Sequence, residues 1–414
     1  MPPQQSDIPF CCARVRSAEW GRLKCPTCGL WTCGLHAAVW VDNLPRCYRC
    51  FSCCEYTTHP FSICIENGCG PPGLRHGVLV VDGFYIAGAQ RHCLELLKVL
   101  TQAAISCTVV SVDGGGRWAD LFRKHAARVV MIDSARVSIH DIANVLHLDR
   151  TSFVTAHLSR AIQWIATQDV PPSVRLFAHL HSEPSEHERW PVSGWQRFER
   201  VFFPSQRTLD VASVRGSVEL AAARPRCHVL PNGFATQSDR SMPTSVLQKG
   251  APLHVAVVSR IDEDKLSIPL LINTIHVLRL QATAVHVRVA GGGSCLNELR
   301  ERVCSQALGD LVEFLGFVDD PAPVYVWADV VFLPSKRESM PYVLLESLEF
   351  QRPLVVPAVG IFRDEAIGEL VFTFPPEDHE AAARAILSAA GTAVRSVPRK
   401  GPPWGNEVLR AYRL

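Results

Sequence analysis

Short, nearly continuous apolar runs alternate with amphipathic segments over most of this chain, and no other feature constrains the fold as much. Runs rich in Val, Ile, Leu and Phe are typical of parallel strands that helices cover on both faces. Predicted strands and helices alternate from residue 77 to residue 204, and a second series begins at residue 253 after a polar stretch at 236–250. We therefore expect an α/β protein with two Rossmann-like, doubly wound domains that face a cleft.

Size and composition agree with this arrangement. The 414 residues are 47% hydrophobic and 20% charged, which is typical of a chain with two or three globular domains. The formal net charge of +2 offers no general attraction for nucleic acid or an anionic membrane. No apolar stretch is long enough to span a bilayer and the first residues lack a secretory signal, so we expect a cytoplasmic protein.

Cysteine is concentrated near the N-terminus. Of the 16 cysteines, 11 lie between Cys11 and Cys69, and the Pro- and Gly-rich residues 70–77 follow them as a linker. We expect residues 1–75 to form a small Cys-rich module. Two CxxC pairs predict a structural zinc site, because two such turns can aim four thiolates at one ion. The four predicted ligands are Cys25, Cys28, Cys47 and Cys50.

The other cysteines of this module leave its metal content open. They are numerous enough for a second site, so the sequence does not distinguish one zinc ion, two or none. A disulfide cluster and a metal-free, reactive tail are the alternatives, and the missing export signal argues against disulfides. A segment with so few apolar runs would gain folding free energy from a bound metal.

Two glutamates in the second series carry the strongest indication of a ligand site. Glu338 lies in the loop after a predicted strand, and Glu346 lies inside the next predicted helix, whose first turn holds Pro341. The N-terminus of such a helix presents unpaired N–H groups that suit an anion. The two carboxylates would then accept hydrogen bonds from sugar and ribose hydroxyls. A surface glutamate and an ordinary helix glutamate are the alternative interpretation.

Two cations precede these glutamates in the same series. Arg260 and Lys265 follow a buried predicted strand, where they could neutralise a diphosphate. The acidic residues between them also fit a solvated turn. Residues 290–294, with the sequence AGGGS, form a predicted strand-to-helix turn that permits close approach of the backbone.

The order of these motifs resembles that of the family 4, GT-B-type retaining glycosyltransferases. The resembling segments of the second half are 260–265, 290–293, 314–320, 328–339 and 341–347. In the first half, GAQRH resembles the glycine loop that faces the donor diphosphate, and AHLHSEPS contains a match to the histidine that contacts the transferred sugar. These two residues are Gly88 and His181.

The resemblance implies a domain organisation. Residues 76–245 would form the N-terminal, acceptor-binding domain, and residues 246–390 the domain that binds the nucleotide-sugar donor. Residues 391–414 would form a terminal helix that returns to the first domain. The Cys-rich segment is no part of the family pattern.

The resemblance also implies a reaction, namely transfer of a hexosyl group from a nucleotide-diphosphate sugar to an acceptor hydroxyl with retention of configuration. Arg260, Lys265 and Gly88 would bind the diphosphate and Glu346 the ribose. Glu338 and His181 would be the catalytic residues, and no metal ion would be needed. The leaving phosphate can take the acceptor proton, so no side-chain base is assigned.

The acceptor is left open, with a glycan, a lipid-linked molecule or a small molecule as the choices. The product would be a polysaccharide, a glycolipid or another glycoconjugate. Peripheral contact of the protein with the inner face of the membrane is one option beside a fully solvated surface, and no nucleic-acid partner is expected. Departures from the family pattern, such as Ser339 to Tyr342 in place of Gly-Phe-Gly, leave the donor open too. The alternative is a non-catalytic nucleotide-sugar-binding or assembly protein whose zinc module docks a partner.

Overall fold

The computed structural model divides the chain into two compact units, each built from discontinuous segments. The first unit comprises Met1–Phe203, Ala212–His228 and Val408–Leu414, and the second comprises Pro204–Val211 and Val229–Glu407. The structure describes residues 22–24, 31–33, 39–41, 44–46, 75–146, 148–183, 190–191, 193–235, 251–281, 284–364, 367–392 and 404–414. The final helix, α15 (Trp404–Tyr412), begins in the second unit and ends in the first.

Four short strands are described near the N-terminus. They are β1 (Arg22–Lys24), β2 (Trp31–Cys33), β3 (Val39–Val41) and β4 (Leu44–Arg46). The first two pair with each other in antiparallel fashion, and β3 pairs antiparallel with β4. The predicted zinc ligands Cys25, Cys28, Cys47 and Cys50 lie outside the described residues.

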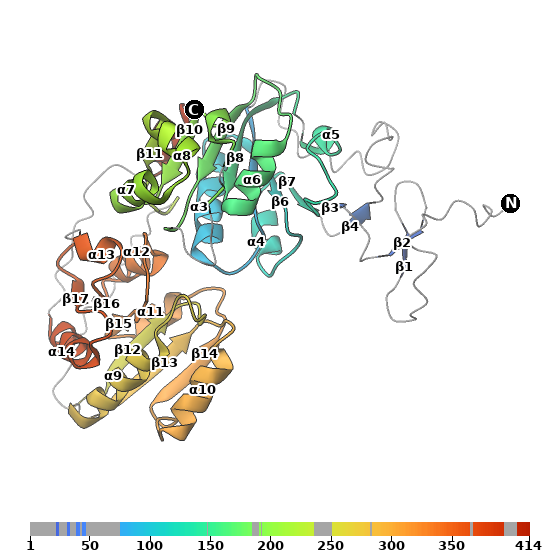
Figure 1. Cartoon of the computed structure of the whole chain (residues 1–414). Coiled ribbons are helices and arrows are strands. Elements are labelled where there is room, and N and C mark those ends of the chain that lie inside the picture. The colour runs from blue at the N-terminus through green and yellow to red at the C-terminus, as the bar shows by residue number, and fades with distance from the viewer. Residues whose placement is uncertain are drawn as a thin grey trace. The chain divides into compact units, whose positions relative to one another are not determined.

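The first unit is built on a nine-stranded sheet with the order β11-β10-β9-β8-β5-β6-β7-β3-β4 (Figure 1). Its main strands are β5 (His76–Val81), β6 (Ser106–Ser111), β7 (Arg128–Ile132), β8 (Thr151–His157), β9 (Arg175–His179), β10 (Arg200–Phe203) and β11 (Cys227–Val229). Strands β5 to β10 pair in parallel, while β3 joins β7 in antiparallel fashion at one side. In order of sequence the parallel strands lie 3-2-1-4-5-6, which is the Rossmann order.

Helices connect these parallel strands. They are α3 (Gly88–Gln102), α4 (Ala119–Arg123), α5 (Ala143–Leu146), α6 (Ser159–Thr167), α7 (Gln206–Arg215) and α8 (Val218–Ala222), with the 3₁₀ turns η3 (Trp195–Arg197) and η4 (Arg224–Arg226). Both α3 and α6 pack against β5, all six residues of which are buried. The continuous apolar run of β5 is thus the consequence of a strand with no solvent-facing side.

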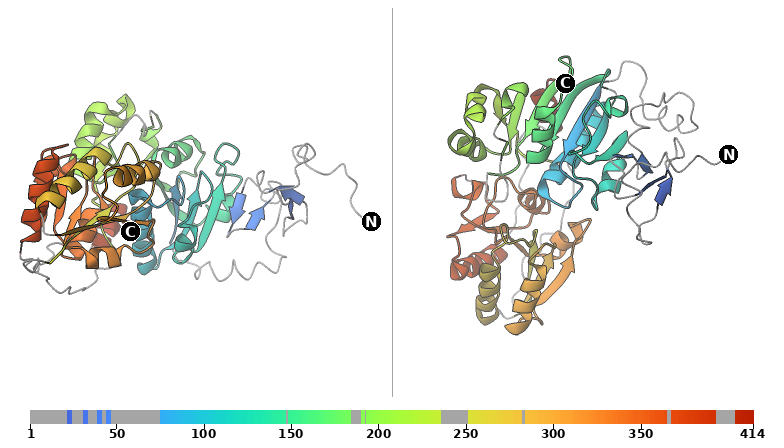
Figure 2. Two further views of the ribbon diagram at one scale, coloured as in Figure 1. Left: turned by 90° about the horizontal axis from the view of Figure 1, so that it is seen from below. Right: turned by 45° about the vertical axis from the view of Figure 1, so that its right-hand side comes forward.

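The second unit repeats the plan with six parallel strands in the order β14-β13-β12-β15-β16-β17. They are β12 (Leu253–Val258), β13 (Val285–Ala290), β14 (Val312–Gly316), β15 (Val330–Phe332), β16 (Leu354–Pro357) and β17 (Val371–Phe374). The helices are α9 (Ile268–Gln281), α10 (Leu296–Ser305), α11 (Ala322–Trp327), α12 (Tyr342–Glu349), α13 (Ile361–Asp364) and α14 (His379–Ala390). Figure 2 shows each sheet with helices on its faces. The prediction of two Rossmann-like α/β domains is confirmed.

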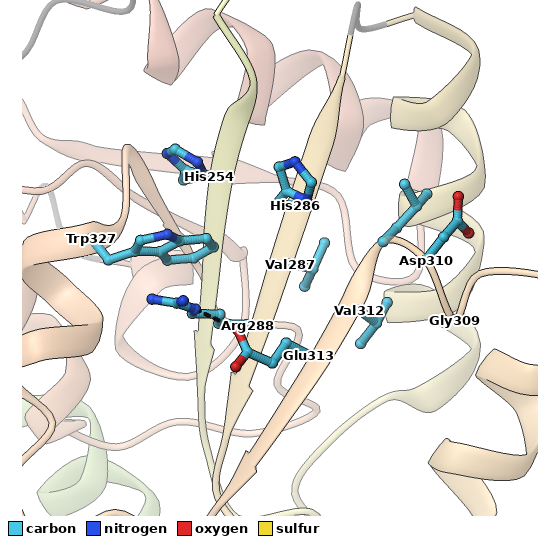
Figure 3. A pocket seen from close by; sticks show the side chains of 10 residues that line it. His254, His286, Val287, Arg288, Gly309, Asp310, Val312, Glu313 and Trp327 are labelled. Carbon is cyan, nitrogen blue, oxygen red and sulfur yellow. Dashed lines mark hydrogen bonds and ion pairs between the residues drawn. The ribbon is translucent and has the colours of Figure 1, made fainter.

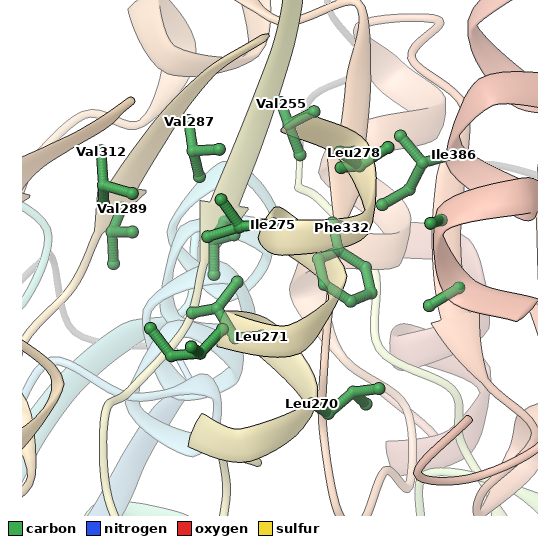
Figure 4. Packing of buried hydrophobic residues seen from close by; sticks show 14 of the residues in the cluster. Val255, Leu270, Leu271, Ile275, Leu278, Val287, Val289, Val312, Phe332 and Ile386 are labelled. Atoms are coloured by element: carbon green, nitrogen blue, oxygen red, sulfur yellow. The ribbon is translucent and has the colours of Figure 1, made fainter. Parts of the chain in front are cut away.

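The core of the second unit follows the alternation of side chains along its strands. Val330 and Phe332 of β15 point into a cluster with α9, α10 and α14, part of which is shown in Figure 4. Val331, between them, joins a different cluster with α11 and α12. Successive residues of a strand face opposite sides of the sheet, so a single apolar run packs against helices on both faces. Among the described residues, no helix combines the length and hydropathy needed to cross a membrane.

Helix α9 offers a direct test of this packing. Ile275 is 1% exposed in the cluster, whereas Leu280, on the same helix, is 86% exposed. We expect Ile275→Ala to lower the free energy of unfolding by about 2–5 kcal/mol through cavity formation. Leu280→Ala is the control and should change it by no more than about 0.5 kcal/mol. Urea denaturation measures both, and equal midpoints for the two variants would contradict the assigned core.

Candidate functional site

The candidate site of the second unit forms where the loops after β12, β13 and β15 lie next to one another. Strand β12 lies between β13 and β15. The chain adds β13 and β14 on one side of β12 and then crosses over to add β15 on the other side, so the strand order reverses at β12. In doubly wound sheets the crevice at such a switch point, at the carboxyl ends of the strands, is where ligands bind. Arg260, Lys265 and Glu338 all lie in these loops.

Backbone hydrogen bonds join the loop after β12 to the loop after β15. Ser267 N–H donates to the carbonyl of Pro334, and Lys336 N–H donates to the carbonyl of Lys265, both at 2.9 Å. An ion pair between Arg337 and Asp264, also at 2.9 Å, supports the same contact. The two loops therefore hold their side chains in a fixed relation.

Lys265 and Glu338 are in direct contact. The Lys265 Nζ donates to Glu338 Oε1 at 2.6 Å, and the side chain of Glu338 is 3% exposed. A buried carboxylate without a cation would be strongly destabilising, so the lysine both neutralises and orients it. These two predicted site residues, distant in sequence, are brought together by the fold.

Arg260 has a different environment from Lys265. Its Nη1 donates to Asp262 Oδ2 at 2.7 Å, and its side chain is 44% exposed. Asp262 also accepts a hydrogen bond from the backbone of Ser294 at 2.8 Å. Asp262 therefore links Arg260 to the glycine turn and leaves part of the guanidinium group exposed.

The glycine turn after β13 depends on the missing side chains. Gly291 has φ of +146° and Gly293 has φ of +157°, a region that L side chains rarely adopt. A Cβ on Gly291 would lie 1.8 Å from the carbonyl oxygen of Ser259. The turn packs directly on the loop after β12 for this reason.

Helix α12 carries the second predicted glutamate. It begins at Tyr342, so Pro341 is the residue before the helix rather than part of its first turn as the sequence predicted. The proline cannot donate a hydrogen bond in either position, and its extended backbone marks the boundary. Glu346 is buried, and its Oε2 accepts from the hydroxyl of Tyr325 at 2.6 Å.

The start of α12 is held by a loop from earlier in the chain. Asn232 Nδ2 donates to the carbonyl of Met340 at 2.6 Å, and the Tyr342 hydroxyl donates to the carbonyl of Gly233 at 3.2 Å. On the other side, Gly360, with φ of +54°, approaches so closely that a Cβ would lie 1.6 Å from the carbonyl oxygen of Glu338. The backbone around Glu338 and Met340 is thus fixed from two directions.

The remaining predicted site residues belong to the first unit. Gly88 is the first residue of α3, and a Cβ there would meet no atom within 4 Å, so local packing does not require glycine at this position. His181 follows β9, and its Nε2 lies 3.2 Å from Nδ1 of His157. His157 ends β8, next to β9 in the sheet.

Two further histidines complete a cluster that the sequence did not predict as a unit. His92 from α3 and His179 from the end of β9 are buried with His157, and the rings of His157 and His179 stack with centroids 4.3 Å apart. Burial lowers the pKa of His157, His179 and His181 well below 6.5, and the charge of neighbouring rings adds to this. The imidazoles are therefore neutral at pH 7. The available signal was a histidine at the same end of two adjacent parallel strands.

Asp82, at the carboxyl end of β5, was also missed. Burial raises its pKa to about 6, although the N–H of Ala161 donates to its Oδ1 at 2.7 Å at the start of α6. Nearby, Arg160 and Asp113 form an ion pair at 2.8 Å. The carboxyl edge of the first sheet thus gathers titratable groups from three segments of the chain.

A shallow pocket of about 430 Å³ lies away from all of these residues. Figure 3 shows its lining, with His254, His286 and Val312 near the amino ends of β12, β13 and β14 and Trp327 at the end of α11. The carboxyl ends of those strands point the other way. We therefore place the candidate site at the loops described above and not in this pocket.

Comparison with known families gives a match for part of the second unit. Residues 252–391 match the family model described as "Glycosyl transferases group 1". A stretch of 157 residues is 28% identical to the GalNAc-alpha-(1->4)-GalNAc-alpha-(1->3)-diNAcBac-PP-undecaprenol alpha-1,4-N-acetyl-D-galactosaminyltransferase of Campylobacter jejuni, and covers 38% of this chain and 42% of that protein. A stretch of 116 residues is 34% identical to the D-inositol 3-phosphate glycosyltransferase of Geodermatophilus obscurus, and covers 27% and 26%. The chain thus spans less than half the length of these curated relatives.

Solved structures are similar over most of the chain. Anabaena Alr3699/HepE in complex with UDP has a TM-score of 0.61 at 17% identity, over 81% of this chain and 95% of that one. A glycosyltransferase from Rickettsia africae has a TM-score of 0.59 at 14% identity, over 81% and 93%. At this identity the likeness establishes the fold, two Rossmann-like domains of the GT-B type.

The buried histidines predict that mild acid destabilises the folded chain. The pKa values of His157 and His179 lie below 6.5 in the folded state, so below about pH 6.5 the unfolded state binds protons that the folded state does not. Each such histidine therefore lowers the free energy of unfolding as the pH falls below that point, and the raised pKa of Asp82 offsets only part of this loss.

We expect the urea midpoint to stay constant from about pH 8 to 7 and to fall steadily between about pH 6.5 and 5.5. His140→Gln removes a histidine whose side chain is 61% exposed and should leave this pH dependence intact. A midpoint that does not change down to about pH 5.5 would contradict the prediction.

Proposed function

We propose that this chain is a retaining glycosyltransferase that transfers a sugar from a nucleotide-diphosphate sugar to an acceptor hydroxyl. The observation that carries the proposal is the 2.6 Å ion pair of Lys265 with the buried Glu338, at the carboxyl ends of β12 and β15. This pair lies inside the segment that matches the glycosyl transferases group 1 model. A buried, oriented carboxylate beside a cation suits such a reaction. The carboxylate can accept hydrogen bonds from the sugar hydroxyls and can stabilise the positive charge that develops on the sugar ring in the transition state.

The leaving group is a negatively charged nucleotide diphosphate, and this charge suggests the roles of the other site residues. Lys265 and Arg260, with the N–H groups at the start of α12, would stabilise the departing diphosphate. Glu346 would accept hydrogen bonds from the ribose hydroxyls. The Tyr325 hydroxyl donates to Glu346 Oε2 and would orient this carboxylate. Gly88 and His181 of the first unit would contact the diphosphate and the transferred sugar. No metal ion is required in this scheme, because lysine, arginine and backbone N–H groups supply the positive charge.

The names of similar proteins guide the choice of substrates. The Anabaena relative is described in complexes with UDP and with UDP-glucose, so a UDP-sugar is the first donor to test. The Campylobacter relative is named for a sugar acceptor carried on PP-undecaprenol. We propose a glycan or lipid-linked acceptor for this chain, and a lipid-linked one would bring the enzyme to the inner face of the membrane.

Donor turnover tests the assignment of Lys265 and Glu338. We expect Lys265→Ala and Glu338→Gln each to lower kcat/KM for sugar release from the active donor by about 100-fold or more, because each removes charge that stabilises the transition state. Lys336→Ala is the matched control. The Nζ of this neighbouring exposed lysine donates to the carbonyl of Glu263, and kcat/KM of the variant should stay within about twofold of the parent value.

Mass spectrometry of a panel of UDP- and GDP-sugars identifies the donor, and nucleotide release measures the rate. Unchanged turnover in both site variants would refute the assignment. Nucleotide-sugar binding without any turnover in the parent protein would favour the non-catalytic binding protein instead.

We also propose that the N-terminal module binds structural zinc through Cys25, Cys28, Cys47 and Cys50. The support is the spacing of the two CxxC pairs, which suits a closed tetrahedral thiolate site. Metal analysis of the purified full chain should find at least one zinc per chain, and Cys25→Ser and Cys47→Ser should each lower that content by one zinc. Cys304→Ser changes an exposed cysteine elsewhere and should retain the metal. A parent chain without zinc would end this proposal.

A further inference from the structure

A continuous path of hydrogen bonds connects the last helix of the chain to His181. The Tyr412 hydroxyl lies 2.8 Å from Thr155 Oγ1, and Thr155 Oγ1 lies 3.3 Å from His157 Nε2. His157 Nδ1 then lies 3.2 Å from His181 Nε2. The Tyr412 hydroxyl also lies 2.6 Å from His179 Nε2, so it stands at a branch of the path.

All hydrogen bonds between Thr155 and His181 must donate in the same direction along the path. A neutral imidazole has one N–H donor and one bare acceptor nitrogen, and a hydroxyl has one proton to give. If Thr155 receives a proton from His157 Nε2, then His157 Nδ1 is bare and His181 must donate from Nε2. If Thr155 donates instead, every bond reverses and His181 carries its proton on Nδ1. The choice at Thr155 therefore sets the tautomer of a residue two bonds away.

Tyr412 makes that choice. A phenol is a more acidic donor than an imidazole N–H or a threonine hydroxyl, and a bare imidazole nitrogen is a stronger acceptor than a hydroxyl oxygen. In the 2.6 Å bond, Tyr412 therefore donates to His179 Nε2. The tyrosine has then used its proton and accepts from Thr155. Tyr412 is fully buried, with its ring against Phe153, Phe177 and Phe202, so its hydroxyl is held in place.

Two groups of side chains here have ligand atoms close enough together to hold a metal ion, namely His92 with His157 and His179, and Cys93 with His157 and His181. In the hydrogen-bonded arrangement, however, both nitrogens of His157 and Nε2 of His179 and of His181 already face a hydroxyl or another imidazole. The pairing accounts for these buried polar atoms without an ion.

We propose that Tyr412 and Thr155 are positioning residues that fix His181 as the Nε2–H tautomer, so that Nδ1 is a bare acceptor for a hydroxyl group of the transferred sugar. The tautomer is a property of the protein without ligand. The contact between Nδ1 and the sugar rests on the proposed function of His181.

Nitrogen NMR of the full chain with ¹⁵N-labelled histidine tests the tautomer directly, because protonated and bare ring nitrogens have well-separated shifts. Signals of His157 and His181 are assigned by their loss in His157→Asn and His181→Asn. We expect the parent protein to show His181 protonated at Nε2 and His157 protonated at Nε2. In Tyr412→Phe the ring packing is kept but Thr155 loses its acceptor and turns to His157, so both histidines should change to the Nδ1–H form.

Thr151→Val is the matched control. Thr151 is a buried threonine of the same strand whose hydroxyl donates to the carbonyl of Leu146 at 3.0 Å and takes no part in the path to His181. It should lose a comparable hydrogen bond and leave the tautomers unchanged. A parent spectrum with His181 protonated at Nδ1, shifts typical of metal-bound nitrogens, or unchanged tautomers in a folded Tyr412→Phe variant would each overturn the proposal.

Kinetics test the second part separately. With the active donor, we expect Tyr412→Phe to lower kcat/KM by about tenfold, the equivalent of one buried hydrogen bond, and Thr151→Val to change it by less than about twofold. Altered tautomers with unaltered kinetics would overturn the contact between His181 and the sugar while the positioning role stands. If the chain transfers no sugar, the proposed function fails and the NMR result still decides the tautomer.

Discussion

Parallel pairing of β12 with β15 is the constraint on which the candidate site depends. These strands are neighbours in the sheet although two other strands, β13 and β14, separate them in sequence. Because parallel strands end on the same side, the loops that follow them must meet, and Lys265 reaches Glu338 across 73 positions of the chain. The backbone bonds between these loops then hold a charged pair in a place that is mostly out of water.

The first unit uses the same principle for different chemistry. Strands β8 and β9 end side by side and place His157 and His179 in a stack, and His181 and Tyr412 extend the polar cluster. Burial keeps the imidazoles neutral, so the residues of this cluster affect one another through the direction of their hydrogen bonds and not through charge. In the second unit Lys265 pairs with Glu338 and Arg260 pairs with Asp262. Each unit thus brings to its carboxyl edge a different type of polar group.

The predicted strands and helices are mostly those of the structure, since buried parallel strands leave an unmistakable apolar pattern. Strand β8 departs from this pattern for a physical reason. Its sequence, TSFVTAH, contains Thr151, Thr155 and His157, which are polar yet buried. Two of their hydrogen-bond partners, His181 after β9 and Tyr412 of the last helix, come from segments far away in the sequence, so a local pattern does not show that this strand lies in the middle of the sheet. The domain boundaries and the roles of the site residues stay predictions.

The sequence by itself determined the fold class and the neighbourhood of the candidate site. Apolar periodicity decides which segments can be buried strands, and polar residues that directly follow those strands must lie at the carboxyl edge. Only the tertiary structure decided which partner each polar group has. It pairs Arg260 with Asp262 and Glu346 with Tyr325, and it brings Tyr412 to Thr155 across 257 positions of the chain. A hydrogen bond depends on distances of tenths of an ångström between atoms from remote segments, and a one-dimensional pattern does not contain those distances.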